Sequence, residues 1–464
     1  MLNVTPKFIK GLAVGLSAAL IQACGIIDDD DNNSNSGPIG TAKVQVIHAS
    51  PDAPAVNVLA GGSTLLEGFD YGSASPRLEV DAGDLEVEVQ GLLPDGSTPS
   101  VIGPVSLSLM ADFEYTVLAV DNVSNIEALV VNRQTNPIET GQLRAQVVHA
   151  APNAPLVDVY VTAPSAILAE SAALGTIDFK GGVGPVDVPA GDYRIRVTIA
   201  GDPAQVVFDS GTVALSAGLD LTIAAIENTL TGDAPINLLV ATNEGSFIIQ
   251  DSAATADVRV VHASPNAPNV DVYVNDGADP AISNLAYPEF TSFIPLPADT
   301  YNFKVTATGA DIGTAVIDAD VPLAQGQFYS VLAVDELATI EPLLLNADRR
   351  RVATAAKVQI VHASPSAGIV DIYVTAPGTD ISTVEPAISG FEFKNTTDGF
   401  IQLPEGTYDI TVTPTGTTDA AIDLNDIQLD AGGLYTVIAR DAARPNPGDS
   451  PLPLNVILLD DFNV

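Results

Sequence analysis

One phrase recurs four times along this chain and constrains its fold more than any other feature. It reads VIHASPDAPAVNVLA around His48, VVHAAPNAPLVDVYVT around His149, VVHASPNAPNVDVYVN around His262 and IVHASPSAGIVDIYVT around His362. The histidines are 101, 113 and 100 residues apart. A period of this length is the size of a domain and much longer than a solenoid unit. We therefore interpret the 464 residues as a tandem array that contains four similar domains.

Two further elements repeat with the same period. The first is a turn that leads into alternating residues, as in VPAGDYRIRV near Gly191 and LPEGTYDITV near Gly406, and the second is a run such as PLAQGQFYSVLAV. Each unit contains about seven short β-like runs bounded by Gly, Pro, Asp or Asn, and none has sustained helical periodicity. The pattern predicts an all-β protein of four tandem β-sandwiches, immunoglobulin-like or transthyretin-like, and the tyrosine of the second element, in AGxxYTV, resembles a tyrosine corner. The predicted domains are residues 42–140, 144–250, 256–350 and 356–464.

The first 24 residues have the pattern of an export signal. Lys7 and Lys10 precede a short apolar run over 11–21, which is too short to span a bilayer comfortably. The sequence IQAC then ends at Cys24, and this stretch resembles the bacterial lipobox, which implies a diacylated N-terminal cysteine. Cys24 is the only cysteine, so no internal disulfide can form. The alternative is an ordinary signal peptide followed by an unpaired thiol. In lipoproteins, Gly25 in place of Asp implies sorting to the outer membrane, so we expect an exported lipoprotein at the outer membrane or cell surface.

Residues 25–41 form an acidic linker with the sequence DDDDNNSNSG from Asp28 to Gly37. This composition cannot pack, and it predicts a disordered tether between the membrane anchor and the folded domains. The acidic run could also bind a metal, but consecutive Asp residues on a flexible chain are usually solvated. The whole chain has 18 basic and 58 acidic residues, a net charge of −40. Such a surface repels nucleic acid, so we expect no nucleic-acid partner.

The histidine of the repeated phrase is expected at the end of a strand that faces the core. In the second copy, alternation places Ala145, Val147 and His149 on one face, and two prolines then end the strand. The acid or amide nine residues later, such as Asp158, could meet the histidine and form half of a nucleophilic triad. No serine completes it, because the second copy has Ala151 in the phrase and the acid is Asn57 in the first. We therefore predict no catalytic residue, no zinc site and no enzyme, and we predict a structural role for the four histidines.

The residues that alternate with the valines of VDVYV are the candidate ligand or interface residues. If the valines point inward, each Asp and the Tyr two residues later point outward, where they could contact a sugar, a peptide or a neighbouring domain. Packing within the sheet or between domains is the favoured interpretation, and the absence of Trp weakens the case for a sugar platform. These candidates are Asp158, Tyr160, Asp271, Tyr273, Asp371 and Tyr373.

No cofactor is predicted, and structural calcium is left as an alternative. The loops Asn275–Asp279 and Pro94–Gly96 contain ligand-like residues but lack the spacing of an EF-hand. Turn chemistry alone explains both loops.

The phrase VHASPxAPxVDVYV, with the later LPAGxY and LxxGxxYTVxA elements, resembles a family of uncharacterised bacterial domains that recur in tandem in predicted lipoproteins. The resemblance covers nearly all of residues 42–464 and implies a β-sandwich at the cell surface, with no catalytic or ligand residue. The first unit departs from it at Asn57 and Leu59, and the fourth has Gly368 in place of the second proline. The expected function is that of a non-enzymatic, lipid-anchored spacer, adhesion or matrix-interaction module with a protein or glycan partner. The alternative is a surface lipoprotein that binds a glycan or small ligand.

Overall fold

The structure is a computed structural model that describes residues 40–446 and 448–461. The predicted signal peptide, Cys24 and nearly all of the tether lie outside the described residues. Within the described part of the chain, no helix is long and apolar enough to cross a membrane.

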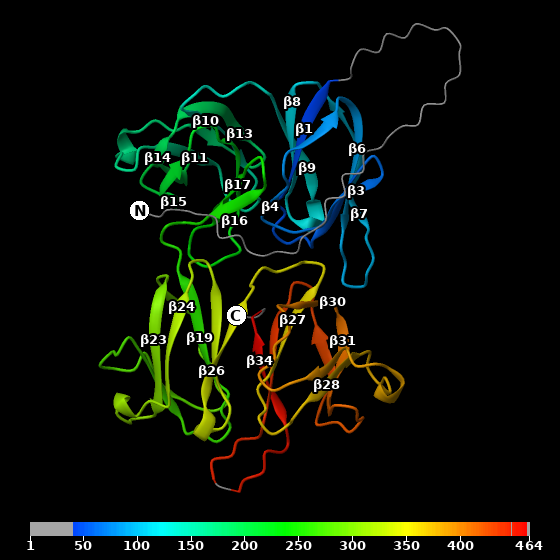
Figure 1. The fold of residues 1–464 in the computed structure, drawn as a ribbon, viewed down its shortest axis with the longest axis vertical. Helices are drawn as coiled ribbons and strands as arrows, with labels where there is room; N and C mark the ends of the chain where they lie inside the picture. The colour runs from blue at the N-terminus through cyan, green and yellow to red at the C-terminus, as the bar shows by residue number, and fades with distance from the viewer. Residues whose placement is uncertain (1–39, 447, 462–464) are drawn as a thin grey trace. The chain divides into compact units, whose positions relative to one another are not determined.

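The described residues form eight β-sheets, two in each of the four predicted domain ranges, and the predicted all-β sandwich class is confirmed. Figure 1 shows the paired sheets and the near absence of helix. The only helical segments among the described residues are five three-residue 3₁₀ turns: η1 (Val123–Asn125), η2 (Leu168–Glu170), η3 (Ile312–Thr314), η4 (Leu337–Thr339) and η5 (Ile381–Thr383).

The first repeat has one sheet in the order β4-β1-β8-β9, with β5 also paired to β1, and a second in the order β3-β2-β6-β7. Its strands are β1 (Thr41–His48), β2 (Val56–Ala60), β3 (Ser63–Phe69), β4 (Ser73–Ala74), β5 (Leu78–Asp81), β6 (Gly83–Gly91), β7 (Ser100–Leu109), β8 (Phe113–Val120) and β9 (Glu127–Gln134).

The second repeat has the sheets β13-β10-β16-β17-β18 and β12-β11-β14-β15. Its strands are β10 (Gln142–His149), β11 (Val157–Thr162), β12 (Gly175–Ile177), β13 (Gly182–Pro189), β14 (Gly191–Ile199), β15 (Val206–Leu215), β16 (Asp220–Glu227), β17 (Ile236–Ala241) and β18 (Ser246–Ile249).

The third repeat has the sheets β22-β19-β25-β26 and β21-β20-β23-β24. Its strands are β19 (Ala256–His262), β20 (Val270–Val274), β21 (Ile282–Leu285), β22 (Ile294–Leu296), β23 (Asp299–Ala307), β24 (Ile317–Leu323), β25 (Phe328–Val334) and β26 (Glu341–Ala347).

The fourth repeat has the sheets β30-β27-β33-β34 and β29-β28-β31-β32. Its strands are β27 (Ala356–His362), β28 (Val370–Thr375), β29 (Ile388–Phe391), β30 (Ile401–Leu403), β31 (Gly406–Pro414), β32 (Ile422–Leu429), β33 (Leu434–Arg440) and β34 (Asn455–Asp460).

The strand that ends in histidine pairs in parallel with the strand of the YTVLAV element in every repeat. In the first repeat Val46 lies opposite Val117, and in the third Val260 lies opposite Val331. A parallel pair cannot be closed by a hairpin, so the chain visits the other sheet in between. The HASPxAP corner makes this change of sheet, because β1 and β2, and their counterparts, belong to different sheets.

The histidine strands are buried on both faces. In β10, Leu143 and Val147 join Val157 and Val159 of β11 in the core of the second sandwich, as the alternation predicts. The opposite face of β10 contributes Val148 to a separate apolar cluster that also contains residues of the first repeat.

Two clusters of this second kind join the repeats in pairs. The first links repeats 1 and 2 through Ile47, Ala49, Leu118, Val148, Ala150, Ala224 and Leu239. The second links repeats 3 and 4 through Val261, Ala263, Leu332, Val361, Ile438 and Leu459. Because these side chains are almost fully buried, each pair of repeats shares an apolar interface in addition to its two sandwich cores.

Few basic residues are available in this acidic chain, and several bind across the paired repeats. Glu114 is buried beside Arg77 and Arg133, at 2.9 and 2.8 Å, and both arginines also bind Asp220 of the second repeat. Removing one member of such a buried network leaves another charge uncompensated.

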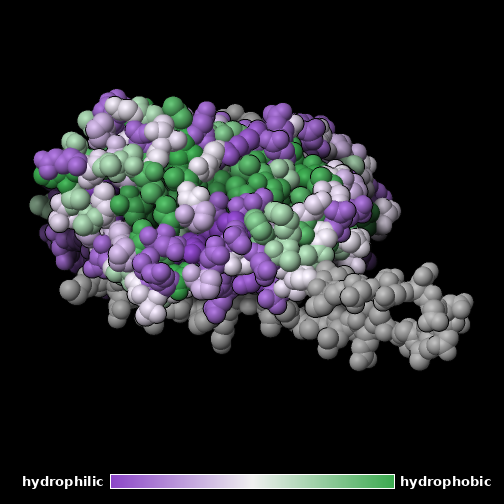
Figure 2. Space-filling view, turned by 90° about the horizontal axis from the view of Figure 1, so that it is seen from above, coloured by the Kyte–Doolittle hydropathy of each residue, from purple (hydrophilic) through white to green (hydrophobic). Residues whose placement is uncertain are grey.

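Figure 2 shows that, on the face it presents, apolar residues gather in two areas separated and bordered by hydrophilic residues.

Candidate functional site

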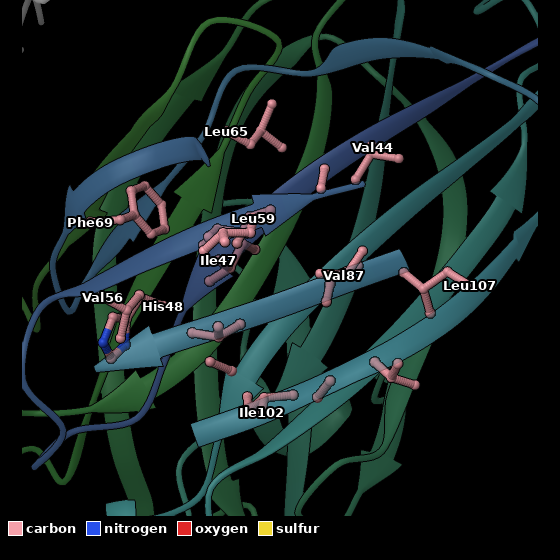
Figure 3. Close-up of a pocket in the computed structure, with 18 of the residues that line it drawn as sticks. Val44, Ile47, His48, Val56, Leu59, Leu65, Phe69, Val87, Ile102 and Leu107 are labelled. Atoms are coloured by element: carbon pink, nitrogen blue, oxygen red, sulfur yellow. The ribbon is translucent and has the colours of Figure 1, made fainter. Parts of the chain in front are cut away.

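The four histidines occupy equivalent, buried positions at the ends of β1, β10, β19 and β27. Their exposed fractions are between 0% and 2%. Figure 3 shows His48 at the end of a row of apolar side chains that includes Val56 and Val87 and fills the space between the sheets of the first repeat. The predicted orientation of the histidine toward the core is therefore what the structure shows.

Each histidine is hydrogen-bonded to the loop that follows it. The ring Nε2 lies 3.1 Å from the carbonyl oxygen of Pro54 in the first repeat and 2.8 Å from that of Gly368 in the fourth. The equivalent distances to Pro155 and Pro268 are 3.2 and 3.0 Å. A carbonyl oxygen only accepts, so Nε2–H donates and the proton of the neutral ring is on this nitrogen. The bond ties the end of the histidine strand to the residue six positions later, across the corner between the two sheets.

Burial holds these rings in the neutral form. It lowers the pKa of His48 from 6.5 to about 4, and the hydrogen bond to the Pro54 carbonyl opposes this effect only in part. Burial also lowers the pKa of His149, His262 and His362, again against a hydrogen bond to a backbone carbonyl. A neutral imidazole whose N–H is already used is well suited to hold a loop.

An aromatic ring packs against every one of these histidines. Tyr71, Phe179, Tyr287 and Phe393 lie with ring centroids 5.8–6.2 Å from His48, His149, His262 and His362, at steep interplanar angles. Sequence reasoning missed these residues. A signal was present, because DYG, DFKG, AYP and EFKN occur 23–31 residues after the histidines, but the short stretches differ too much to be recognised as one motif.

These aromatic residues also reach the paired repeat, in two alternating ways. In the odd repeats the Tyr71 and Tyr287 hydroxyls donate to the backbone carbonyls of Glu227 and Asp441 in the next repeat, at 2.6 Å in both cases. In the even repeats the ring is Phe, and the following lysine forms ion pairs with acids of the preceding repeat. These pairs are Lys180 with Asp121 and Glu127, and Lys394 with Asp335 and Glu341.

The acid nine residues after the histidine does not meet it. Asp371 accepts from the backbone N–H groups of Gly390 and Gly416 at 2.8 and 2.9 Å, on the opposite face of β28 from the core valines. Asp271 does the same with Asn284 and Gly309, and Asp158 accepts from Thr176 and Gly201. The hypothesis of a His–Asp contact at the corner is therefore wrong, because the two residues belong to different sheets and face away from each other.

These carboxylates bridge the edge strand on one side of the VDVYV strand and the turn that follows the strand on its other side. The hydrogen bonds lower the pKa of each acid from 3.8. The largest effect comes from the Thr176 hydroxyl for Asp158, from the Gly309 N–H for Asp271 and from the Gly416 N–H for Asp371. Gly416 has a φ of +79°, a conformation that favours glycine. In the first repeat, Asn57 makes a weaker version of the contact, accepting from Gly68 at 3.1 Å.

The Asp–Tyr pairs are buried, which agrees with packing and not with an outward-facing contact surface. Tyr160, Tyr273 and Tyr373 are 5%, 8% and 6% exposed, and the acids 5–7%. They do lie on the face opposite the core valines, but that face is covered. In the second repeat Arg196, which lies opposite Tyr160 in the neighbouring strand, donates to the Ala166 carbonyl in the connection after β11.

The tyrosines of the later motifs hold their own turns. The hydroxyl of Tyr193 donates to the Pro189 carbonyl, and Tyr301 and Tyr408 make the same bond to Pro297 and Pro404. In the YTVLAV element, the Tyr329 hydroxyl accepts from the Ala324 N–H at 3.1 Å. This bond to upstream backbone is the geometry of a tyrosine corner.

Among the described residues, no group of three or more His, Cys, Asp or Glu side chains could hold a metal ion. In the two loops considered for calcium, Asp276 forms an ion pair with Lys304, and Asp95 accepts from the backbone N–H and hydroxyl of Ser97. Both carboxylates thus have protein partners.

The fold and these contacts define a class of protein: tandem β-sandwich repeats whose first strand ends in a buried, neutral histidine that holds the sheet-changing corner. The chain belongs to the family described as Domain of unknown function (DUF4397), whose model matches residues 42–160 and 256–373. Each match begins at the first strand of an odd repeat and ends in the VDVYV strand of the next one.

No curated protein matches the sequence. Among solved structures, the Bacillus anthracis TIE protein is similar with 10% identity, over 86% of this chain and 68% of that one, at a TM-score of 0.16. A similarity of this size transfers neither fold nor function.

Proposed function

We propose that this chain is a non-enzymatic, lipid-anchored protein of the cell envelope, and that its four sandwiches serve as a spacer and adhesion or matrix-interaction module. The observation that carries the proposal is the equivalence of the four histidine corners. Each imidazole is buried and neutral and donates its N–H to a loop carbonyl. The histidine, which is the residue of the motif best suited to acid–base chemistry, therefore has a structural contact in every repeat. A catalytic group needs access to a substrate, and these rings have none.

The shared interfaces support the spacer part of the proposal. An apolar cluster joins repeats 1 and 2, and another joins repeats 3 and 4, which restricts motion between the partners of each pair. Paired domains of this kind hold their outer surfaces at defined positions, as a spacer or adhesive surface requires. Large apolar residues exposed on different repeats, such as Met110, Ile167 and Leu452, are available for contacts with a partner.

A sugar platform on the Asp–Tyr face has no such support. The three tyrosines of that face are buried, and the aspartates already bind loop N–H groups.

The anchor and the location are tested together. The wild-type chain should incorporate an alkyne-labelled fatty acid, fractionate with the outer membrane and be digested by protease added to intact cells. Cys24→Ser should lose the label and leave the membrane fraction. An unlabelled wild-type chain would refute the anchor, and a labelled chain that is protected from protease would refute the surface location.

The adhesive role is tested with the purified mature chain. Immobilised protein should bind cells or extracellular polymer above the level of an unrelated acidic protein of similar charge. If nothing binds, adhesion is refuted, and the spacer role then rests on whether removing repeats 3 and 4 reduces antibody access to a C-terminal tag on intact cells.

A further inference from the structure

The fourth sandwich contains a cavity that is much larger than the spaces inside the first two. Its volume is about 250 Å³, whereas the spaces between the sheets of repeats 1 and 2 are about 30 and 20 Å³. All three lie between the two sheets and next to the histidine of the phrase. Protein cores are normally packed with few voids larger than a water molecule, so a space of this size in one of several equivalent domains needs an explanation.

The fourth repeat differs from the second and third at two positions in the middle of the sandwich. The long strand of the LPAGxY element has Phe303 in the third repeat and Ile410 at the same place in the fourth, two residues before Val305 and Val412. On the neighbouring strand, Phe208 lies opposite Val197 in the second repeat, whereas Ile422 lies opposite Val412 in the fourth. Repeats 2 and 3 thus each place one phenylalanine in their core at these positions, and the fourth repeat has isoleucine at both. The first repeat has Val87 and Ile102 there, and its space is small without a phenylalanine, so these two positions distinguish the fourth repeat from the second and third only.

The lining of the cavity is apolar, and its polar groups are already paired. It is formed mainly by Val, Ile and Leu side chains, among them Ile410 and Ile422. His362 donates to the Gly368 carbonyl and accepts from the Ser364 N–H, and the Tyr408 hydroxyl donates to the Pro404 carbonyl. A charged or strongly hydrogen-bonding molecule would lose its hydration here and gain no partner.

The rim of the cavity reaches the surface at the short edge strand β30. Ile401 lines the cavity and is 37% exposed, and Leu403, Pro404 and Tyr408 beside it are half-buried. A ligand of this cavity would enter beside this strand.

We propose that the fourth repeat binds one uncharged apolar molecule of about ten heavy atoms between its sheets. An engineered cavity of about 150 Å³ lined by Leu, Ile and Phe stays dry and binds benzene, so the larger space here accommodates a bicyclic aromatic or a medium-length aliphatic chain. The site is separate from the Asp–Tyr face and independent of the adhesive role.

The test uses the mature chain with 1-octanol and naphthalene as uncharged probes and octanoate as the charged counterpart of octanol. Titration calorimetry should give one octanol or naphthalene per chain, and each probe should raise the melting temperature. Octanoate should bind at least tenfold more weakly than octanol, since the lining offers its carboxylate no partner.

Ile410→Phe copies the side chain of the third repeat and should weaken binding of both uncharged probes at least tenfold while raising the melting temperature without ligand. Ile422→Phe, which copies the second repeat, provides a second variant if the first fails to fold. Leu344→Ser removes an exposed apolar side chain elsewhere and should leave binding unchanged. The proposal is overturned if neither uncharged probe binds the wild type, if octanoate binds as tightly as octanol, or if a folded phenylalanine variant keeps the wild-type affinity.

Discussion

The buried histidines should make the repeats lose stability under mildly acidic conditions. Burial lowers the pKa of His48 to about 4, whereas the unfolded chain binds this proton near pH 6.5. Between these values the unfolded state takes up a proton that the folded state does not, so stability is full above pH 6.5 and is lost as the pH falls toward 4. For His48 alone this loss is about 3 kcal/mol, because each unit of pKa difference corresponds to about 1.4 kcal/mol.

The charged neighbours of His48 do not reverse this sign. Asp70 favours the protonated ring and Arg350 disfavours it, and both effects are smaller than that of burial. The aspartates of the VDVYV strands have pKa values below 3.8, so their contribution is lost only at more acidic pH. Glu227 acts in the opposite direction, since burial raises its pKa and favours the folded state as the pH falls. A comparison between wild type and a histidine variant isolates the histidine from these acids.

The assay is NMR of the four histidine rings labelled with ¹³C at Cε1, each assigned through its own His→Gln variant. No ring of the folded protein should titrate with a midpoint near 6.5, and His48 should remain neutral until about pH 4. Hydrogen exchange of β1 should accelerate between pH 6.5 and 4.5, after correction for the intrinsic rate, and His48→Gln should remove most of that change. A His48 midpoint above 6, or an equal pH dependence in His48→Gln, would refute the reasoning.

Three further perturbations test the contacts described above. Asp371→Ala leaves the N–H groups of Gly390 and Gly416 without their acceptor and should cost about 2–4 kcal/mol in urea denaturation, with a smaller loss for Asp371→Asn, which retains an acceptor oxygen. Tyr71→Phe removes the hydrogen bond to the Glu227 carbonyl of the next repeat and should lower the free energy of unfolding by about 1 kcal/mol. If the substitution lowers it by a similar amount in repeat 1 without repeat 2, the hydrogen bond is not the cause. Leu332→Ala, in the cluster shared by repeats 3 and 4, should cost about 2–5 kcal/mol, and faster hydrogen exchange confined to repeat 3 would argue against a shared core.

The sequence was a good guide to features that depend on local pattern. The four repeats, the two-sheet architecture and the burial of the histidines follow from spacing, alternation and the prolines that end the first strand. What covers the Asp–Tyr face could not be predicted, because alternation gives the face of a strand and says nothing about what lies against that face. The contacts that bury Asp158 come from Thr176 and Gly201, 18 and 43 residues away.

The aromatic partners of the histidines show the same limit in another way. Tyr71 and Phe179 occupy equivalent places, but only contacts with the paired repeat explain why one is Tyr and the other is Phe followed by Lys. The sequence of a single repeat does not contain this information, since the groups that the tyrosine hydroxyl and the lysine contact lie on the neighbouring domain.

These alternating contacts indicate that the pair of repeats, rather than the single sandwich, is the structural unit of the array. Glu227 and Asp121 end equivalent strands in repeats 2 and 1, and each is contacted by the aromatic-bearing loop of the other repeat. The interface is thus built as in a twofold dimer, where the same patch is used on both sides. Asp441 and Asp335 are used in the same way by repeats 3 and 4, and the family matches begin at repeats 1 and 3. An isolated repeat would expose the apolar face of its histidine strand, which the paired repeat covers here.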